Sequence, residues 1–288
     1  MLDSSVKGPP TVYLNHLYLV PDPSTFSGIG HSEFLRKEFA GFSAGTVRAE
    51  GNDTWSGMYL MGKRTYLEFL KANPSGKQKE GDYGIGFGVE EEGGLARVAA
   101  LLRVGTRGQV KRHLRKRKVG DREVPWFRTV DVRYDRKQNY YSRMADSSNL
   151  WVMEYLRSYM EEFKPPNPNP GGGSNARAIS RERYNAPSFS GERLFEDVTG
   201  VELALNRRKS THFVGELRAL GYEIRTSGEQ RVCTGPDVTL TIAPETHESS
   251  GIKVIRMSLL RWMGHRQVYR FGARSTLTLA GRAAIWRF

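Results

Sequence analysis

The stretch Thr65-Tyr66-Leu67-Glu68-Phe69-Leu70 places one glutamate inside a run of aromatic and aliphatic residues. A second phrase of the same kind, Leu150-Trp151-Val152-Met153-Glu154-Tyr155-Leu156, occurs later in the chain. His16 interrupts a third apolar run, residues 12–20. Removing a carboxylate from water is costly unless it is paired, protonated or bound to a metal. One imidazole and two carboxylates on separate apolar strands therefore suggest a three-ligand metal site with open positions for substrate.

The segments around these phrases predict a recurring order of strand, helix and three strands. The first round comprises residues 12–20, a helix at 32–40, and strands at 46–50, 54–61 and 65–71. The second comprises residues 83–90, a helix at 94–103, and strands at 127–134, 140–145 and 150–156. The third comprises residues 198–205, a helix at 210–220, and strands at 222–225, 230–233, 238–243 and 252–260, with further strands at 267–270, 275–280 and 283–288. Residues 150–160 also fit a helix, because Trp151, Tyr155 and Tyr159 are four apart.

Repeated βαβββ units indicate an α+β protein whose modules pack in pairs. The expected boundaries are a first module at 11–80, a second at 81–163, a Pro/Gly-rich linker or loop at 164–190 and a C-terminal α+β module at 191–288. The linker is predicted from the run Lys-Pro-Pro-Asn-Pro-Asn-Pro-Gly-Gly-Gly-Ser-Asn at 164–175.

The composition is that of a folded protein, with 38% hydrophobic residues in 288. The N-terminal residues contain no apolar segment of signal-peptide length, and no run approaches the roughly 18 apolar residues of a membrane span. The single cysteine, Cys233, excludes an internal disulfide framework and fits a reducing compartment. We therefore predict a soluble, cytoplasmic protein without a membrane partner.

The net charge of +13 is concentrated in one segment. Eight basic residues lie there: Arg103, Arg107, Lys111, Arg112, Arg115, Lys116, Arg117 and Lys118. We interpret the segment as a solvated loop or short basic helix, or alternatively as a contact for a nucleic acid or other polyanion through 103–118. Aromatic residues are not interleaved with these charges, which argues against a platform for stacking single-stranded bases.

Several motifs together resemble the vicinal oxygen chelate superfamily, the glyoxalase and bleomycin-resistance proteins, and most closely an uncharacterised group of glyoxalase-like domains. The resemblance rests on these stretches: Asn15-His16-Leu17-Tyr18, Phe34 to Phe39, Trp55 to Leu60 with Gly62-Lys63, Tyr66-Leu67-Glu68, Gly84 to Glu90, Phe271 to Ser275, and Ala284 to Phe288. The basic segment 103–120 and the Pro/Gly-rich loop look like insertions in this pattern.

The resemblance implies that paired βαβββ modules curl into a half-barrel, a curved mixed sheet, around a divalent metal such as Fe, Mn, Zn or Ni. It implies His16, Glu68 and Glu154 as metal ligands. A fourth ligand would fall near Gly84, which has no side chain to offer. The implied function is that of a glyoxalase-like or dioxygenase-like enzyme acting on a small oxygen-chelating substrate.

Strand alternation places Glu68 on one face with Tyr66 and Leu70, and His16 on one face with Leu14 and Tyr18. If they do not bind metal, Glu68 or Glu154 can act as a general base whose pKa is raised by burial. Four aromatic residues are expected to contact the substrate: Tyr18, Trp55, Tyr59 and Tyr66. The Gly84-x-Gly86-x-Gly88 pattern lacks the spacing of a dinucleotide-binding loop.

Two alternatives stay open beside the metal-dependent enzyme. One is a metal-free protein of the same fold that binds a small molecule, which the missing ligand at Gly84 favours. The other is a basic protein that binds a polyanion through Lys111, Arg112, Arg115, Lys116, Arg117 and Lys118. A homodimer is possible in each case.

Overall fold

The N-terminal module follows the predicted element order, with one additional helix before the predicted one. The structure is a computed structural model that describes residues 8–48, 54–73, 78–134, 149–164, 179–247 and 249–288. The module consists of β1 (Tyr13–Leu19), α1 (Pro23–His31), a π-helical turn η1 (Leu35–Phe39), β2 (Gly41–Arg48), β3 (Thr54–Met61) and β4 (Tyr66–Leu70). The start of α1 is fixed by Asp22, whose carboxylate accepts hydrogen bonds from the N–H groups of Ser24 and Thr25. The predicted helix at 32–40 is confirmed, because residues 33–39 are helical and end in η1. The sequence analysis missed α1, which precedes it.

The second module repeats this order. It comprises β5 (Tyr83–Gly88), α2 (Gly94–Gly105), β6 (Gln109–Val119), β7 (Arg122–Arg133) and β8 (Leu150–Tyr155), followed by α4 (Arg157–Phe163). The basic segment was expected to be a loop or short helix, and that expectation is wrong, because most of it forms β6. The helical alternative for 150–160 is also wrong, since β8 ends at Tyr155. The strand predicted at 140–145 lies outside the described residues.

The two modules share one mixed sheet of eight strands in the order β2-β3-β4-β1-β5-β8-β7-β6. Within each module the first and last strands are parallel, β1 with β4 and β5 with β8. The modules join through antiparallel pairing of β1 with β5. The sheet curls until its two edge strands, β2 and β6, approach each other. This confirms the α+β prediction of repeated βαβββ modules in a curved mixed sheet.

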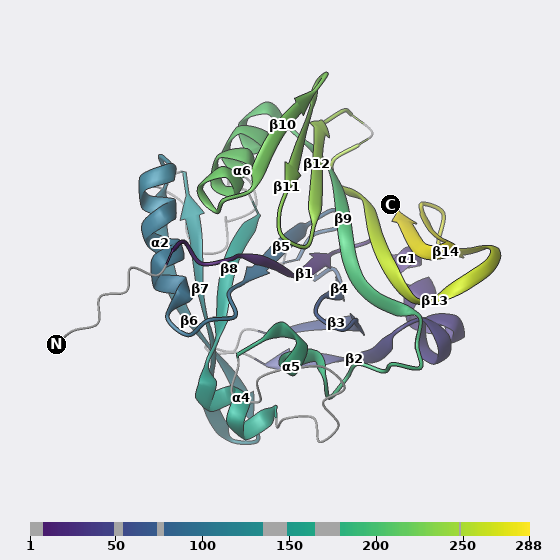
Figure 1. Cartoon of the computed structure of the whole chain (residues 1–288). Helices are drawn as coiled ribbons and strands as arrows, with labels where there is room; N and C mark the ends of the chain where they lie inside the picture. Colours follow the sequence, from purple (N-terminus) through teal and green to yellow (C-terminus); the bar gives the residue numbers. More distant parts are fainter. Residues whose placement is uncertain (1–7, 49–53, 74–77, 135–148, 165–178, 248) are drawn as a thin grey trace.

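The C-terminal module builds a second sheet of six strands (Figure 1). Its elements are β9 (Phe195–Leu205), α6 (Arg207–Ala219), β10 (Glu223–Ser227), β11 (Gln230–Thr234), β12 (Thr239–Pro244), β13 (Gly251–Phe271) and β14 (Ser275–Arg287). β9 is parallel to β12 and antiparallel to β13, as β1 is to β4 and β5. The four short strands predicted after residue 251 merge into the two long strands β13 and β14.

Both sheets contribute to one large hydrophobic core. The indole of Trp286 on β14 is fully buried, and its ring packs against Phe69 and Phe271. Asp197 at the start of β9 accepts hydrogen bonds from the N–H groups of Arg64 and Thr65 at 2.7 and 2.9 Å. These hydrogen bonds join the third module directly to the residues just before β4. Within the described residues, no helix has the length and apolar character needed to span a membrane.

Candidate functional site

Glu68 lies at the centre of a row of side chains on the inner, concave face of the curled sheet. In the strand register it is paired with Tyr59 on β3 and with Tyr18 on β1, and paired residues of adjacent strands share a face. The indole N–H of Trp55 donates to Glu68 Oε1 at 3.0 Å and also lies 3.1 Å from the Tyr59 hydroxyl oxygen. We call Tyr18, Trp55, Tyr59, Glu68 and Trp151 the Glu68 site.

Burial controls the chemistry of this carboxyl group. Only 8% of Glu68 is exposed. Desolvation raises its pKa from 4.5 to about 7, while the hydrogen bonds from Tyr59 and Trp55 act in the opposite direction. The side chains of Tyr18, Trp55, Tyr59 and Trp151 around it are partly exposed. The site therefore combines a carboxyl group that titrates near neutral pH with aromatic rings that reach solvent.

The alternating glycines of β5 make room for large side chains on the same face. A Cβ atom at position 84 would lie 2.3 Å from Tyr18 Cε1 and 2.6 Å from Trp151 Cζ3. One at position 86 would lie 2.6 Å from His16 Cε1. The glycines of the Gly84-x-Gly86-x-Gly88 pattern therefore allow aromatic rings to pack closely against the backbone of β5. They lie within a strand and do not form a phosphate-binding loop.

His16 is held in an aromatic environment on the inner face. Its imidazole stacks on Tyr66 with ring centroids 4.5 Å apart, and Trp151 meets it edge-on at 5.2 Å. Its Nδ1 lies 2.9 Å from Asn15 Oδ1. Burial lowers the His16 pKa to about 3, so the ring is neutral at physiological pH.

A β-bulge between Leu14 and His16 corrects one prediction about this strand. Leu14 pairs with Phe87, whereas His16 pairs with Gly86, its neighbour on β5. Leu14 therefore faces the opposite side of the sheet from His16, and the expectation that the two share a face is wrong. The bulge brings Asn15 to the inner face beside His16, where a Cβ atom at Gly88 would lie 3.2 Å from Asn15 Nδ2.

Glu154 is buried, as expected, but the structure does not bring it together with His16 and Glu68. On β8, Trp151 and Tyr155 contact inner-face rings, so the alternation of the strand turns Glu154 to the outer face. There Glu154 Oε2 accepts a hydrogen bond from the backbone N–H of Leu95 at 2.9 Å, in the first turn of α2. Its observed role is that of a helix cap supplied from another element.

The donor set therefore does not fit the expected three-ligand metal centre. Among the residues that the structure describes, no group of three or more His, Cys, Asp and Glu side chains could hold a metal ion. Glu154 faces the outer side, the second module offers glycines where a ligand is needed, and the ring of Tyr66 lies flat against His16. His16 and Glu68 are left as two donors on the inner face.

A short helix that the sequence analysis did not anticipate packs against the inner face. Residues 164–190 were expected to be a linker or loop; residues 165–178 lie outside the described residues, but α5 (Arg181–Asn185) is a well-buried helix. Tyr184 stacks on Tyr155 at 4.1 Å, and the Tyr155 hydroxyl donates to Asn15 Oδ1 at 3.3 Å. Asn185 Nδ2 donates to the carbonyl of Gly62. The sequence signal was the polar-aromatic stretch 180–185 directly after the Pro/Gly-rich run.

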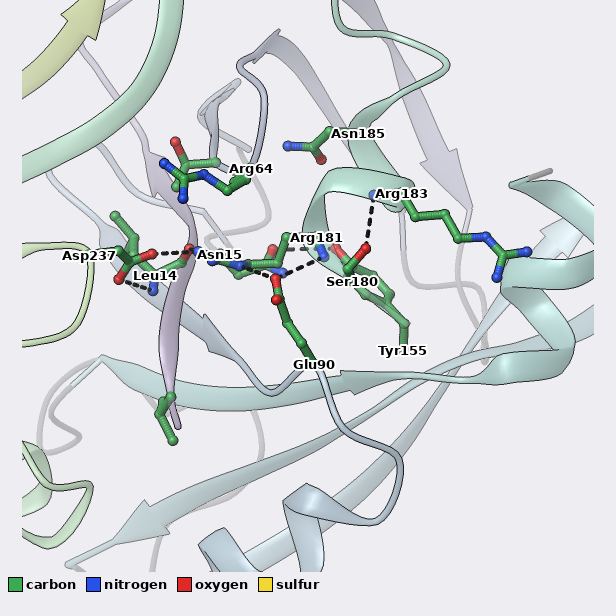
Figure 2. Close-up of polar contacts among 12 residues, drawn as sticks. Leu14, Asn15, Arg64, Glu90, Tyr155, Ser180, Arg181, Arg183, Asn185 and Asp237 are labelled. Atoms are coloured by element: carbon green, nitrogen blue, oxygen red, sulfur yellow. Dashed lines mark hydrogen bonds and ion pairs between the residues drawn. The ribbon is translucent and has the colours of Figure 1, made fainter. Parts of the chain in front are cut away.

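Arg181 fixes α5 to all three modules (Figure 2). Its side chain is 3% exposed. Nε donates to Glu90 Oε1 at 2.8 Å, and Nη1 donates to Asp237 Oδ2 at 2.6 Å and to the carbonyl of Leu14. Asp237 in turn accepts from the N–H of Leu14 at 3.1 Å. One buried guanidinium thus joins β1, the segment after β5 and the C-terminal module.

The basic segment does not present its charges as one surface. Because it forms β6, successive side chains point to opposite faces of the sheet. Lys116 pairs with Glu123 at 3.7 Å, and Arg117 donates to the Tyr159 hydroxyl at 3.4 Å and lies over the ring of Trp126. Lysine-rich edge strands also discourage unwanted strand pairing. Polyanion contact through 103–118 stays a prediction, as does the homodimer.

A surface pocket lies elsewhere, between the end of β1 and the β13–β14 hairpin. Its lining includes Asp22, Asp82, Lys253 and Arg274. None of the residues predicted from the sequence to bind metal or substrate lines it. Its mixed charges indicate no single class of ligand.

Comparisons with known proteins establish a family and a fold. A family model described as "Family of unknown function (DUF5829)" matches residues 14–288. No curated protein matches the chain. A hypothetical protein from Staphylococcus aureus is similar in structure, with a TM-score of 0.55 and 10% identity over 90% of this chain and 95% of that one. At this identity the likeness concerns the fold alone.

Two further structures match more weakly. One is a xylose isomerase-like TIM barrel/4-hydroxyphenylpyruvate dioxygenase fusion protein, with a TM-score of 0.44 and 12% identity over 86% of this chain and 37% of that one. The other is a mutant of 4-hydroxymandelate synthase from Streptomyces coelicolor, with a TM-score of 0.38 and 13% identity over 86% and 70%. At these scores neither carries an argument about function.

Proposed function

The chain belongs to DUF5829, a family of unknown function, and we propose that it binds a small molecule on the inner face of its curled sheet, at the Glu68 site and without a metal. The observation that carries the proposal is the environment of Glu68. A nearly buried carboxyl group is held by neutral donors, Trp55 and Tyr59, next to aromatic rings that are partly exposed.

Three features support binding as the role of this site. Keeping a carboxyl group in apolar surroundings destabilises the folded state unless a partner compensates for it. Aromatic rings supply large contact areas with little loss of conformational freedom, as ligand sites require. The glycines of β5 and the rigid strands β1, β3 and β4 fix the geometry before a ligand arrives, which lowers the entropic cost of binding.

The test is a ligand screen read out by thermal shift and by tryptophan fluorescence. We expect hits that raise the unfolding temperature of the wild type and quench its fluorescence, and that lose both effects in Trp55→Phe. Trp262→Phe is the matched control, because Trp262 is 71% exposed on β13. Hits that bind Trp55→Phe and Glu68→Gln as tightly as the wild type would place binding elsewhere and overturn the proposal.

The metal-dependent alternative has its own measurement. We expect elemental analysis of purified protein to give the same metal content for the wild type, His16→Asn and Glu68→Gln. Stoichiometric Fe, Mn, Zn or Ni that disappears in either variant would contradict a metal-free site.

A second candidate function is proton transfer by Glu68, which its pKa of about 7 favours. The carboxylate would remove a proton from the carbon beside a substrate carbonyl and the resulting acid would return it to the enediolate, so that the reaction is an isomerisation. Incorporation of deuterium from D₂O into dihydroxyacetone, followed by NMR, tests this directly. Incorporation at the same rate with the wild type and Glu68→Gln would exclude Glu68 as the base.

A further inference from the structure

We propose that the ligand of the Glu68 site is a small organic cation, a protonated amine or a quaternary ammonium compound. This inference rests on the proposed binding function and names its ligand class.

The first step is the absence of a counter-ion for Glu68 among the described residues. The contacts of this carboxylate are the indole N–H of Trp55 and the hydroxyl of Tyr59, and both groups are neutral. Two other buried carboxylates in the described part of the chain lie beside a cation. Asp197 pairs with Arg64 at 2.8 Å, and Glu154 lies 3.9 Å from Arg128. Glu68 is thus a buried acid whose ionised form gains most from a cation that arrives from outside.

The second step is the distribution of cation–π contacts. The protein carries a net charge of +13, and within the described residues its own cations lie over four aromatic rings. These pairs are Arg36 over Phe42, Arg117 over Trp126, Lys164 over Tyr184, and Arg181 over Tyr13. Within the described ranges, no Lys or Arg lies over Trp55, Tyr59 or Trp151. The rings beside Glu68 are therefore not covered by a Lys or Arg of the described part of the chain.

The faces of tryptophan and tyrosine rings attract cations, most strongly where water is partly excluded. Tyr59 is beside Glu68 in the register, and Trp55 holds the carboxylate by its N–H. A cation at this position would meet the negative group directly, with the rings of Trp55 and Tyr59 next to it. An anionic ligand would be repelled by the same carboxylate.

The experiment compares probes of one shape and different charge. Benzylammonium, benzyl alcohol and benzoate form one set, and choline with 3,3-dimethyl-1-butanol forms a second. Binding is followed by the indole ¹H–¹⁵N signal of Trp55, assigned by its loss in Trp55→Phe. We expect benzylammonium and choline to shift this signal and to bind at least ten times more tightly than the neutral probes.

Two variants test whether affinity for a cation depends on the charge of Glu68 or only on the net charge of the protein. Glu68→Gln keeps an oxygen that can accept from Trp55 but removes the negative charge, and we expect at least a tenfold loss of affinity for benzylammonium. Glu33→Gln makes the same change on the surface, where Glu33 pairs with Lys37, and is expected to have no effect.

The possible results distinguish failure of the cation class from failure of small-molecule binding at the Glu68 site. If benzyl alcohol or benzoate shifts the Trp55 signal as strongly as benzylammonium, the cation class is wrong while small-molecule binding at the site stands. If no cation shifts the signal but hits from the wider screen do, the same conclusion holds. If cations bind equally well to Glu68→Gln, the carboxylate is not their partner and the inference is overturned.

Discussion

Gly86 on β5 lies directly beneath the imidazole of His16, so closely that a Cβ atom at position 86 would come within 2.6 Å of His16 Cε1. The same hypothetical atom would lie 2.9 Å from Trp151 Cζ2. The glycine therefore determines how deeply His16 and Trp151 pack against the sheet. His16 also stacks on Tyr66, so it has little room to move away.

We expect Gly86→Ala to lower the free energy of unfolding by about 1–3 kcal/mol, because extra atoms in a well-packed core force neighbouring side chains from their preferred conformations. Gly45→Ala is the matched control: Gly45 is also a strand glycine, on β2, and a Cβ atom there meets nothing within 4 Å. Urea denaturation of both variants measures the difference. Equal stability of the two would show that the inner face accommodates the added methyl group.

Removing the side chain of Arg181 should be among the most destabilising single changes in the chain. Arg181→Ala leaves Glu90 and Asp237 without their buried partner, and breaking such a pair typically costs about 3–5 kcal/mol. Arg225→Ala removes an exposed arginine that pairs with Glu223, and should cost less than about 1 kcal/mol. Urea denaturation followed by circular dichroism distinguishes them. A small effect at Arg181 would mean that water or other cations replace its contacts.

Glu154→Ala should weaken the start of α2 without altering the Glu68 site. The lost acceptor for the N–H of Leu95 should cost about 0.5–2 kcal/mol, the usual effect of removing a helix cap. Glu154→Gln retains an oxygen acceptor and should be milder. The Trp55 indole NMR signal should stay unchanged in both variants. A shifted Trp55 signal would indicate that Glu154 communicates with the inner face.

The pH dependence of stability should reveal Glu68 and His16 as opposing contributions. The pKa of Glu68 rises from 4.5 to about 7 on folding, so the folded state retains a proton that the unfolded chain has lost. The free energy of unfolding should therefore fall as pH rises across this window, by up to about 3 kcal/mol. The pKa of His16 falls from 6.5 to about 3, so its contribution is lost as pH falls through that range.

Between pH 4.5 and 6.5 the titrations of Glu68 and His16 change the free energy of unfolding in opposite directions. Above pH 6.5 only the titration of Glu68 changes it. Unfolding measured from pH 6.5 to 8 should thus show a decline in the wild type that is absent in Glu68→Gln. Parallel curves for the two proteins over this range would contradict the raised pKa. His16→Asn should flatten the acid side of the profile below pH 4.5.

The sequence by itself determined the modules and the burial of their polar residues. The apolar runs around Glu68 and Glu154 predicted a buried strand for each, although residues 150–160 also fitted a helix, and each glutamate is at most 8% exposed. The repeated βαβββ order followed from the same local pattern. The helix predicted at 32–40 was found at 33–39, whereas the additional helix α1, which starts at the Asp22 cap, was not predicted.

Only the tertiary structure decided which face each polar residue occupies and what it meets there. Alternation gives two faces for every strand but does not say which one lies inside a curled sheet, so Glu154 was assigned to the same site as Glu68. The bulge at Asn15 changed the parity of β1, and α5 brought Arg181 and Tyr184 from more than a hundred residues away. These outcomes depend on contacts between elements distant in sequence, and a local pattern carries no information about them.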